Sequence, residues 1–155
     1  MITIITGNIN DHKTTKAYRH FLKDRKGDGV LSVKIMDHHQ VLYYEAFHLQ
    51  SNQKKVLCYH EKHQQVDSKH EKIGPYGFIP ETQKWVENLM IHLIEQKVEP
   101  LYLDEIGVLE LEGHGFHSIL KRMLESQLDL VLVMRKPLIE RWKQMYQVEA
   151  VTIIE

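Results

Sequence analysis

Short apolar runs alternate with helical patterns at both ends of the chain, and this alternation constrains the fold more than any other feature. Strands are expected over residues 1–6, 101–103, 128–134 and 148–154, and helices over residues 13–25, 80–94, 116–124 and 137–146. A strand that leads into a helix, repeated along a chain, indicates a mostly parallel sheet covered by helices on both faces. The sequence therefore predicts a three-layer α/β/α fold.

The middle of the chain has a different pattern. Three β-rich runs at 30–36, 41–49 and 56–59 follow one another with short polar connections, which predicts a hairpin or meander. We therefore expect an antiparallel insertion between residues 30 and 60. The polar, His-rich stretch 60–80 is expected to be a long exposed loop with turns.

Composition is that of an ordinary globular domain. The chain has 155 residues, of which 43% are hydrophobic and 26% charged, so we expect one domain, 1–155, that buries about 70% of its unfolded surface. A net charge of −1 gives no general attraction to polyanions, so nucleic acid is not an expected partner. The apolar runs are far shorter than the roughly 20 residues that span a bilayer, and the single Cys58 favours a reducing cytoplasm.

The turn between the first strand and the first helix has the context of a phosphate-binding loop, G-x-x-x-x-G-K-[ST]. In such a loop, backbone N–H groups and the helix N-terminus surround the phosphates, Lys13 supplies a point charge, and the Thr14 hydroxyl binds Mg²⁺. The residues expected to contact the nucleotide are Gly7, Asn8, Ile9, Asn10, Asp11, His12, Lys13, Thr14 and Thr15. The alternative is an ordinary strand-to-helix turn with a lysine at the helix entry.

Two residues of this loop oppose phosphate binding. His12 replaces the second glycine of the pattern, and its Cβ costs about 1–2 kcal/mol if the site needs a left-handed conformation. The Asp11 carboxylate repels a triphosphate unless it points into solvent. An imidazole at His12 that points away from the loop, or contacts phosphate as a cation, is compatible with the same sequence.

The strand at 101–103 runs into Asp104 and Glu105. A hydrophobic strand that ends in Asp-Glu follows the phosphate loop in many NTPases, where the aspartate holds Mg²⁺ and the glutamate activates water. The two motifs support each other, so Asp104 is a candidate metal ligand and Glu105 a candidate catalytic residue.

These residues carry a resemblance to a known family. Residues 104–111, D-E-I-G-V-L-E-L, are similar to the D-E-I-G-x-M-E-L segment of the P-loop nucleoside-triphosphatase family typified by THEP1, and Phe116 matches a downstream Phe. Three shorter matches add to the resemblance: the I-T-G that ends at Gly7, the K-T-T of residues 13–15 and the G-P-Y of residues 74–76. The resemblance is weak between residues 28 and 72.

The resemblance implies a doubly wound sheet that hydrolyses NTP to NDP with Mg²⁺, through the residues already named. Where the family has G-x-P-G-x-G-K-T-T, this chain keeps the first glycine and has Asn10 and His12 at the other two. Asparagine tolerates left-handed conformations better than most residues, so Asn10 is the milder change. The family element at 74–77 makes Tyr76 a candidate contact to the base.

Further charged residues are weaker candidates. Arg135 follows the strand 128–134, where ligands of parallel sheets gather, and is a candidate arginine finger together with Lys136; the alternative is a solvated charge at a helix entry. Glu110 is either a second acid or a loop or helix-entry carboxylate. The basic residues of 16–26 are interrupted by acidic ones and predict a solvated helix face rather than an RNA site.

Eleven histidines suggest metal binding, but the spacing does not support a zinc site. Cys58, His60 and His63 form one group and His114 and His117 another, and neither supplies four ligands. No zinc is therefore expected.

Two functions fit the sequence. One is Mg²⁺-dependent binding and hydrolysis of a nucleoside triphosphate by Lys13, Thr14, Asp104, Glu105 and Arg135. The other is a catalytically impaired nucleotide-binding or scaffold protein that acts through a protein partner, which the changes in the phosphate loop favour.

Overall fold

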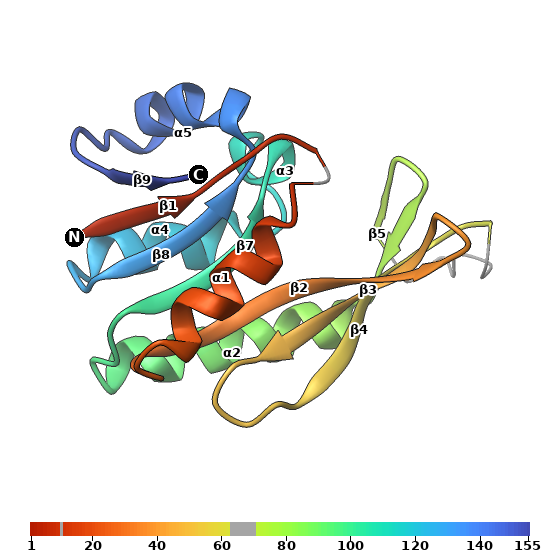
Figure 1. The fold of residues 1–155 in the computed structure, drawn as a ribbon, viewed down its shortest axis with the longest axis horizontal. Coiled ribbons are helices and arrows are strands. Elements are labelled where there is room, and N and C mark those ends of the chain that lie inside the picture. The colour runs from red at the N-terminus through yellow and green to blue at the C-terminus, as the bar shows by residue number, and fades with distance from the viewer. Residues whose placement is uncertain (10, 63–70) are drawn as a thin grey trace.

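The computed structural model describes residues 1–9, 11–62 and 71–155, with the backbone alone described at residue 71 (Figure 1). The strands are β1 (Ile2–Ile5), β2 (Asp28–Asp37), β3 (Gln40–His48), β4 (Lys54–His60), β5 (Glu71–Ile73), β6 (Tyr76–Phe78), β7 (Leu101–Ile106), β8 (Leu130–Met134) and β9 (Thr152–Ile154). The helices are α1 (Lys13–Leu22), α2 (Pro80–Glu95), α3 (Val108–Leu111), α4 (His117–Glu125) and α5 (Ile139–Tyr146), with a 3₁₀ helix at Lys136–Leu138.

The described strands form one mixed sheet in the order β5-β6-β4-β3-β2-β7-β8-β1-β9. The neighbours from β2 to β9 pair in parallel. The neighbours from β2 to β5 pair antiparallel, so β3, β4, β6 and β5 extend the sheet on the side of β2 away from β7 (Figure 1). Parallel strands that alternate with helices confirm the predicted α/β fold.

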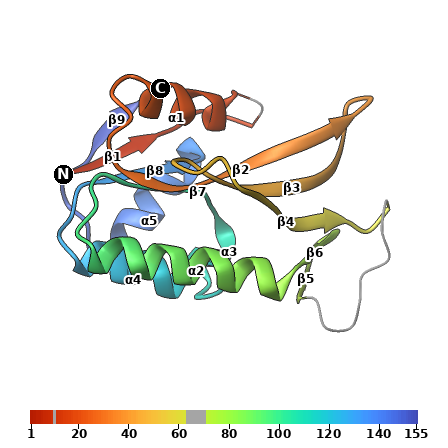
Figure 2. The ribbon, with the colours of Figure 1, turned by 90° about the horizontal axis from the view of Figure 1, so that it is seen from below.

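Side chains of the central strands alternate between two cores, as the period of two in a strand requires. Ile4 and Leu103 face the core under α2, α4 and α5, whereas Ile5 and Tyr102 face the core under α1. Figure 2 shows α1 on one side of the sheet and α2 with α4 on the other. The fully buried Phe21 meets Tyr102 edge to face, with ring centroids 5.8 Å apart, and this contact fixes α1 on its face.

The antiparallel extension is larger than the predicted insertion. The hairpin or meander between 30 and 60 is confirmed as β2, β3 and β4, but the predicted exposed loop 60–80 contains two short strands, β5 and β6. They are joined by a two-residue turn in which Gly74 has a φ of +56°, a conformation that glycine adopts without strain. Three-residue strands are too short to give a readable alternation. Residues 63–70 of the predicted loop lie outside the described residues.

The helix and strand ends also differ from the predictions. The first helix ends at Leu22 rather than at residue 25, and the last begins with a 3₁₀ turn, because the proline at 137 opens it. The last strand covers only Thr152–Ile154 of the predicted 148–154. Element termini are where local sequence signals are weakest.

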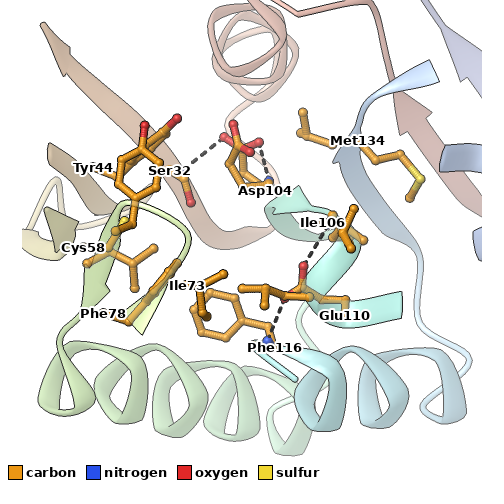
Figure 3. Close-up of a pocket in the computed structure, with 18 of the residues that line it drawn as sticks. Ser32, Tyr44, Cys58, Ile73, Phe78, Asp104, Ile106, Glu110, Phe116 and Met134 are labelled. Carbon is orange, nitrogen blue, oxygen red and sulfur yellow. Dashed lines mark hydrogen bonds between the residues drawn. The ribbon is translucent and has the colours of Figure 1, made fainter. Parts of the chain in front are cut away.

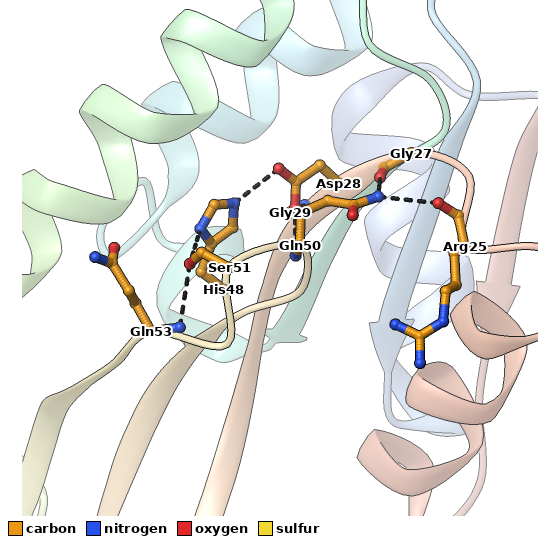
Figure 4. Close-up of polar contacts among 8 residues, drawn as sticks. All are labelled: Arg25, Gly27, Asp28, Gly29, His48, Gln50, Ser51 and Gln53. Carbon is orange, nitrogen blue, oxygen red and sulfur yellow. Dashed lines mark hydrogen bonds and ion pairs between the residues drawn. The ribbon is translucent and has the colours of Figure 1, made fainter.

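The turn between β3 and β4 is fastened to the start of β2 by a network around a buried carboxylate (Figure 4). Asp28 Oδ1 accepts hydrogen bonds from the backbone N–H groups of Gly29, at 2.8 Å, and Gln50, at 3.2 Å. Its Oδ2 lies 2.7 Å from His48 Nε2, and His48 Nδ1 lies 2.6 Å from Ser51 Oγ. These contacts join the antiparallel extension firmly to the parallel part of the sheet.

Candidate functional site

The carboxyl ends of three strands bring the predicted site residues together. β8 pairs in parallel with both β1 and β7, so all three end at one edge of the sheet. The phosphate loop follows β1, Arg135 follows β8, and Asp104 and Glu105 lie at the end of β7. Ligands of open parallel sheets bind at such an edge.

The phosphate loop turns into α1 at His12. His12 has φ 55° and ψ 39°, a left-handed conformation, and its side chain is exposed. Residue 12 therefore has the backbone conformation that suits the second glycine of the phosphate-loop pattern. A histidine adopts this conformation at a cost of about 1–2 kcal/mol. α1 has no side-chain cap at its N-terminus. Asn10 lies outside the described residues, and Ile9 and Thr15 are exposed.

Asp11 does not point into solvent away from the loop. Its Oδ2 accepts a hydrogen bond of 2.6 Å from the backbone N–H of Asn8. A Cβ added at Gly7 would lie 2.7 Å from Asp11 Cβ and 2.9 Å from its Oδ2, so glycine is needed there for the side chain to fold back. The Asn8 amide group of the loop therefore already binds an anionic group, the Asp11 carboxylate.

Lys13 closes the loop from the other side. Its Nζ donates a hydrogen bond of 2.8 Å to the carbonyl oxygen of Asn8. Burial lowers the pKa of Lys13, an effect opposed by the nearby Glu105 carboxylate and reinforced by the positive charges of Lys34 and Arg135. The ammonium group therefore lies within the field of both the acidic and the basic groups at this edge.

Asp104 links β7 to the phosphate loop. It is 2% exposed, and its Oδ2 accepts hydrogen bonds from Thr14 Oγ1, at 2.7 Å, and from the Ser32 backbone N–H, at 3.0 Å. Its Oδ1 accepts a hydrogen bond of 2.6 Å from the backbone N–H of Glu105. Burial, together with the neighbouring Glu105 charge, raises the pKa of Asp104 to about 7 despite these bonds.

The pair of Thr14 and Asp104 fits a magnesium ion. Mg²⁺ prefers oxygen ligands, and in nucleotide sites it takes one or two from the protein and the rest from water and phosphates. A hydroxyl and a carboxylate oxygen 2.7 Å apart supply such a pair, and a buried carboxylate with a raised pKa gains most from a neighbouring cation.

Glu105 owes its position to an irregularity in β7. Leu103 pairs with Leu132 and Ile106 with Met134, so β7 has one residue more than β8 over this stretch. Such a bulge re-aims side chains near sites. Glu105 has a φ of 56° and is exposed, whereas Asp104 just before it is buried. The two carboxylates therefore face different surroundings, one toward α1 and one toward open space.

Glu110 is a helix-entry carboxylate, one of the readings that the sequence left open. It is 3% exposed, and its carboxylate accepts hydrogen bonds from the backbone N–H groups of Gly107, at 2.8 Å, and Phe116, at 3.0 Å. Burial raises its pKa, an effect opposed by these bonds. Glu110 thus holds the short α3 to the start of α4.

A cavity of about 290 Å³ opens beside Asp104 and Glu105 (Figure 3). Lys13 and Arg135 also line it. Its walls come from the ends of β7 and β8, from α3 and the start of α4, and from the antiparallel strands. Four aromatic residues contribute to the lining: Tyr44, Tyr76, Phe78 and Phe116.

Sequence reasoning did not single out Ser32, Tyr44 or Phe78. Ser32 carried a signal, since it is a polar residue within a buried apolar strand, and its N–H serves Asp104. Tyr44 and Phe78 gave none, because they reach the site only through the pairing of β3, β4 and β6.

Among residues 1–9, 11–62 and 71–155, no group of three or more His, Cys, Asp or Glu side chains is placed to hold a metal ion. Cys58 is buried in the cavity wall, and burial raises its pKa to about 12. His63 lies outside the described residues. No helix in the described part of the chain is long and apolar enough to cross a membrane.

Comparisons with known proteins agree with this fold. The crystal structure of THEP1 from the hyperthermophile Aquifex aeolicus superposes with a TM-score of 0.70 at 20% identity, covering 100% of this chain and 89% of that one. The solution structure of a human cancer-related nucleoside triphosphatase superposes with a TM-score of 0.65 at 16% identity, covering 99% of this chain and 87% of that one. At these identities the likeness shows the fold.

No curated protein sequence matches the chain. The family model described as NTPase matches residues 2–155, which is nearly the whole sequence. The chain therefore belongs to the NTPase family, as its motifs predicted.

Proposed function

We propose that residues 1–155 form one domain that binds a nucleoside triphosphate with Mg²⁺ and hydrolyses it to the diphosphate and phosphate. The observation that carries the proposal is the 2.7 Å hydrogen bond between Thr14 Oγ1 and Asp104 Oδ2. It joins two motifs that are 90 residues apart in the chain and sets Glu105 beside them, as phosphoryl transfer requires.

Each residue has a role in this proposal. Lys13 and the amide groups at the start of α1 bind the phosphates. Thr14 and Asp104 hold Mg²⁺, which when bound neutralises charge on the phosphate oxygens. Glu105 orients the attacking water and accepts its proton, and Arg135 stabilises charge on the transferred phosphoryl group.

The test is release of phosphate from ATP and GTP in the presence of Mg²⁺ or of EDTA. Glu105→Gln is expected to reduce turnover by about 10²–10⁴-fold, the usual contribution of a general base. Glu125→Gln, an exposed glutamate on α4, is the matched control and should retain wild-type turnover. Wild-type protein that releases no phosphate from either nucleotide would refute hydrolysis.

A second function is favoured by Asp11, whose carboxylate occupies the Asn8 amide in the loop. If this anion competes strongly enough with phosphate, the chain is a nucleotide-binding or scaffold protein that acts through a protein partner. Titration calorimetry with ATP, GTP and non-hydrolysable analogues separates the cases. Binding without turnover identifies a binding module, and absence of binding identifies a scaffold. If nucleotide binds, the melting temperature of the protein should also rise as the nucleotide concentration increases.

A further inference from the structure

Lys34 lies on β2, where this strand passes the phosphate loop. The backbone of Ser32, two residues earlier, contacts both proposed metal ligands. Its carbonyl oxygen accepts a hydrogen bond of 3.4 Å from Thr14 Oγ1, and its N–H donates one of 3.0 Å to Asp104 Oδ2. Two residues of a strand span about 7 Å, a distance that the four-carbon stem of a lysine can bridge. The Lys34 ammonium group can therefore reach a phosphate held beside Thr14 and Asp104.

The register of β2 and β3 places Lys34 on the cavity side of the sheet. Side chains two residues apart in a strand share a face, so Lys34 is on the same face as Ser32. Lys34 pairs with Tyr44 of β3, and paired residues also share a face. Ser32 and Tyr44 both line the cavity, and Figure 3 shows them on the same side of it. Lys34 is therefore on the side of the sheet where the nucleotide site opens.

The charge of Lys34 acts on the phosphate-loop lysine. Burial lowers the pKa of Lys13 most, and two neighbouring cations lower it further, Lys34 by more than Arg135. Arg135 itself lines the cavity, so Lys34 interacts with Lys13 at least as strongly as a residue of the cavity wall does. Repulsion among these three cations is relieved when an anion binds between them.

Lys34 is available to such an anion. The neighbouring lysines Lys54 and Lys55 lie over the rings of Phe47 and Trp85, 5.8 and 5.0 Å from the ring centroids. The Lys34 side chain is exposed, and within the residues that the structure describes it has neither a ring contact of this kind nor an ion pair. A bound phosphate therefore does not have to displace a partner from it.

The position of Glu105 indicates which phosphate Lys34 meets. Glu105 and Tyr44 both line the cavity. Burial and, next, the Glu105 charge raise the pKa of Tyr44, so this carboxylate lies near the residue with which Lys34 pairs. In the proposed hydrolysis Glu105 acts at the transferred phosphoryl group. Lys34 is thus on the side of the γ-phosphate.

We propose, as an extension of the proposed function and resting on it, that Lys34 binds the γ-phosphate of the nucleoside triphosphate. Its ammonium group donates hydrogen bonds to γ-phosphate oxygens, while Lys13 binds the phosphates from the loop. This second lysine offsets the Asp11 carboxylate, which adds negative charge to the loop. The strand that begins the antiparallel extension thereby becomes part of the nucleotide site.

The test is titration calorimetry with AMPPNP, the β,γ-imido analogue of ATP, and with ADP, each in Mg²⁺. Lys34→Met keeps the length of the side chain and removes its charge. It should weaken AMPPNP binding by about tenfold or more, the value of a charge-assisted hydrogen bond. ADP has no γ-phosphate, so its affinity should change by less than about threefold, as expected for a screened charge.

Two further variants control for charge and chemistry. Lys121→Met removes one positive charge from an exposed position on α4 and should leave both affinities unchanged. Lys34→Arg keeps the charge and should retain most of the AMPPNP affinity. Because Lys34 is exposed, all three variants should fold as wild type does, which circular dichroism checks.

Each result decides one question. Wild-type affinity of Lys34→Met for AMPPNP, with weakened binding by Lys13→Met, would overturn the role of Lys34 and leave the proposed function intact. Equal losses for AMPPNP and ADP would overturn the assignment to the γ-phosphate. Absence of binding of both nucleotides by folded wild-type protein would overturn the proposed function, and the role of Lys34 with it.

Discussion

Removal of the Asp104 charge is predicted to stabilise the metal-free protein while it abolishes turnover. Asp104 is 2% exposed, and burial raises its pKa from 3.8 to about 7. The folded state therefore holds the proton more tightly than the unfolded state between about pH 4 and pH 7. Stability from this group is fully present below pH 3.8 and is lost as pH rises through about 7.

The size of the effect follows from that shift. Above pH 7 the folded state must hold Asp104 ionised. The rise of its pKa from 3.8 to about 7 means that this destabilises the folded protein by about 4 kcal/mol, at about 1.36 kcal/mol per pKa unit. Asparagine carries no charge, but it has one acceptor oxygen where the carboxylate uses two. One hydrogen bond is lost, at about 1–3 kcal/mol. Asp104→Asn should therefore be about 1–3 kcal/mol more stable than wild type at pH 8.

The assay is urea unfolding, followed by circular dichroism, in EDTA at pH 5 and pH 8. At pH 5 the folded Asp104 is largely protonated but the unfolded carboxyl is ionised, so about 1–2 kcal/mol of the penalty remains, and the lost hydrogen bond should cancel the advantage of the variant. Asp37→Asn, an exposed carboxylate at the end of β2, should change stability little at either pH. Mg²⁺ with a non-hydrolysable NTP should stabilise wild type and not the variant. An Asp104→Asn variant that is less stable than wild type at both pH values would refute the reasoning.

Three further substitutions test the loop and the support of the site. His12→Gly should tighten NTP binding by about 1 kcal/mol in titration calorimetry, which is roughly fivefold in Kd. Glycine adopts a φ of 55° and places no Cβ between the amide groups and the phosphate. Weaker binding by the variant would identify the imidazole as a ligand contact. Asp11→Ser should tighten binding at low salt and less at high salt, because it removes a carboxylate from the loop. Gly115→Ala should cost more stability in urea than Gly113→Ala, since both glycines have positive φ but only a Cβ at Gly115 would collide with another group, the Glu110 carboxylate; equal costs would contradict this.

The parallel part of the fold was predictable because its residues carry strong local signals. Leu101 and Leu103 belong to one core and Tyr102 to the other, and such a wholly apolar strand flanked by helices marks a buried parallel strand. The position of Asp104 and Glu105 at the carboxyl end of this strand was predictable because an apolar strand that ends in Asp-Glu is a recognisable motif. Their roles with Mg²⁺ and water stay predictions.

The cavity was not predictable, because its wall is assembled by strand pairing. Tyr44, Cys58 and Phe78 lie on β3, β4 and β6 and meet only through the register of these strands. The bulge at Glu105 depends on the pairing of β7 with β8 and leaves no mark in either segment alone. Glu110 was ambiguous because its partners are the backbone N–H groups of Gly107 and Phe116, which any sequence supplies.

The altered phosphate loop is best judged by comparing the magnitudes of the two changes that oppose binding. His12 already has the left-handed conformation that glycine would take, so its backbone cost of about 1–2 kcal/mol falls on folding, and its Cβ weakens nucleotide binding only by the roughly 1 kcal/mol that His12→Gly should recover. Asp11 is exposed, and an exposed charge interaction is worth about 0–1 kcal/mol. A triphosphate gains charge-assisted hydrogen bonds from Lys13 and the amides of α1, each worth about 1.5–3 kcal/mol. Attraction exceeds repulsion on these magnitudes, which favours a loop that binds nucleotide with reduced affinity over one that has lost it.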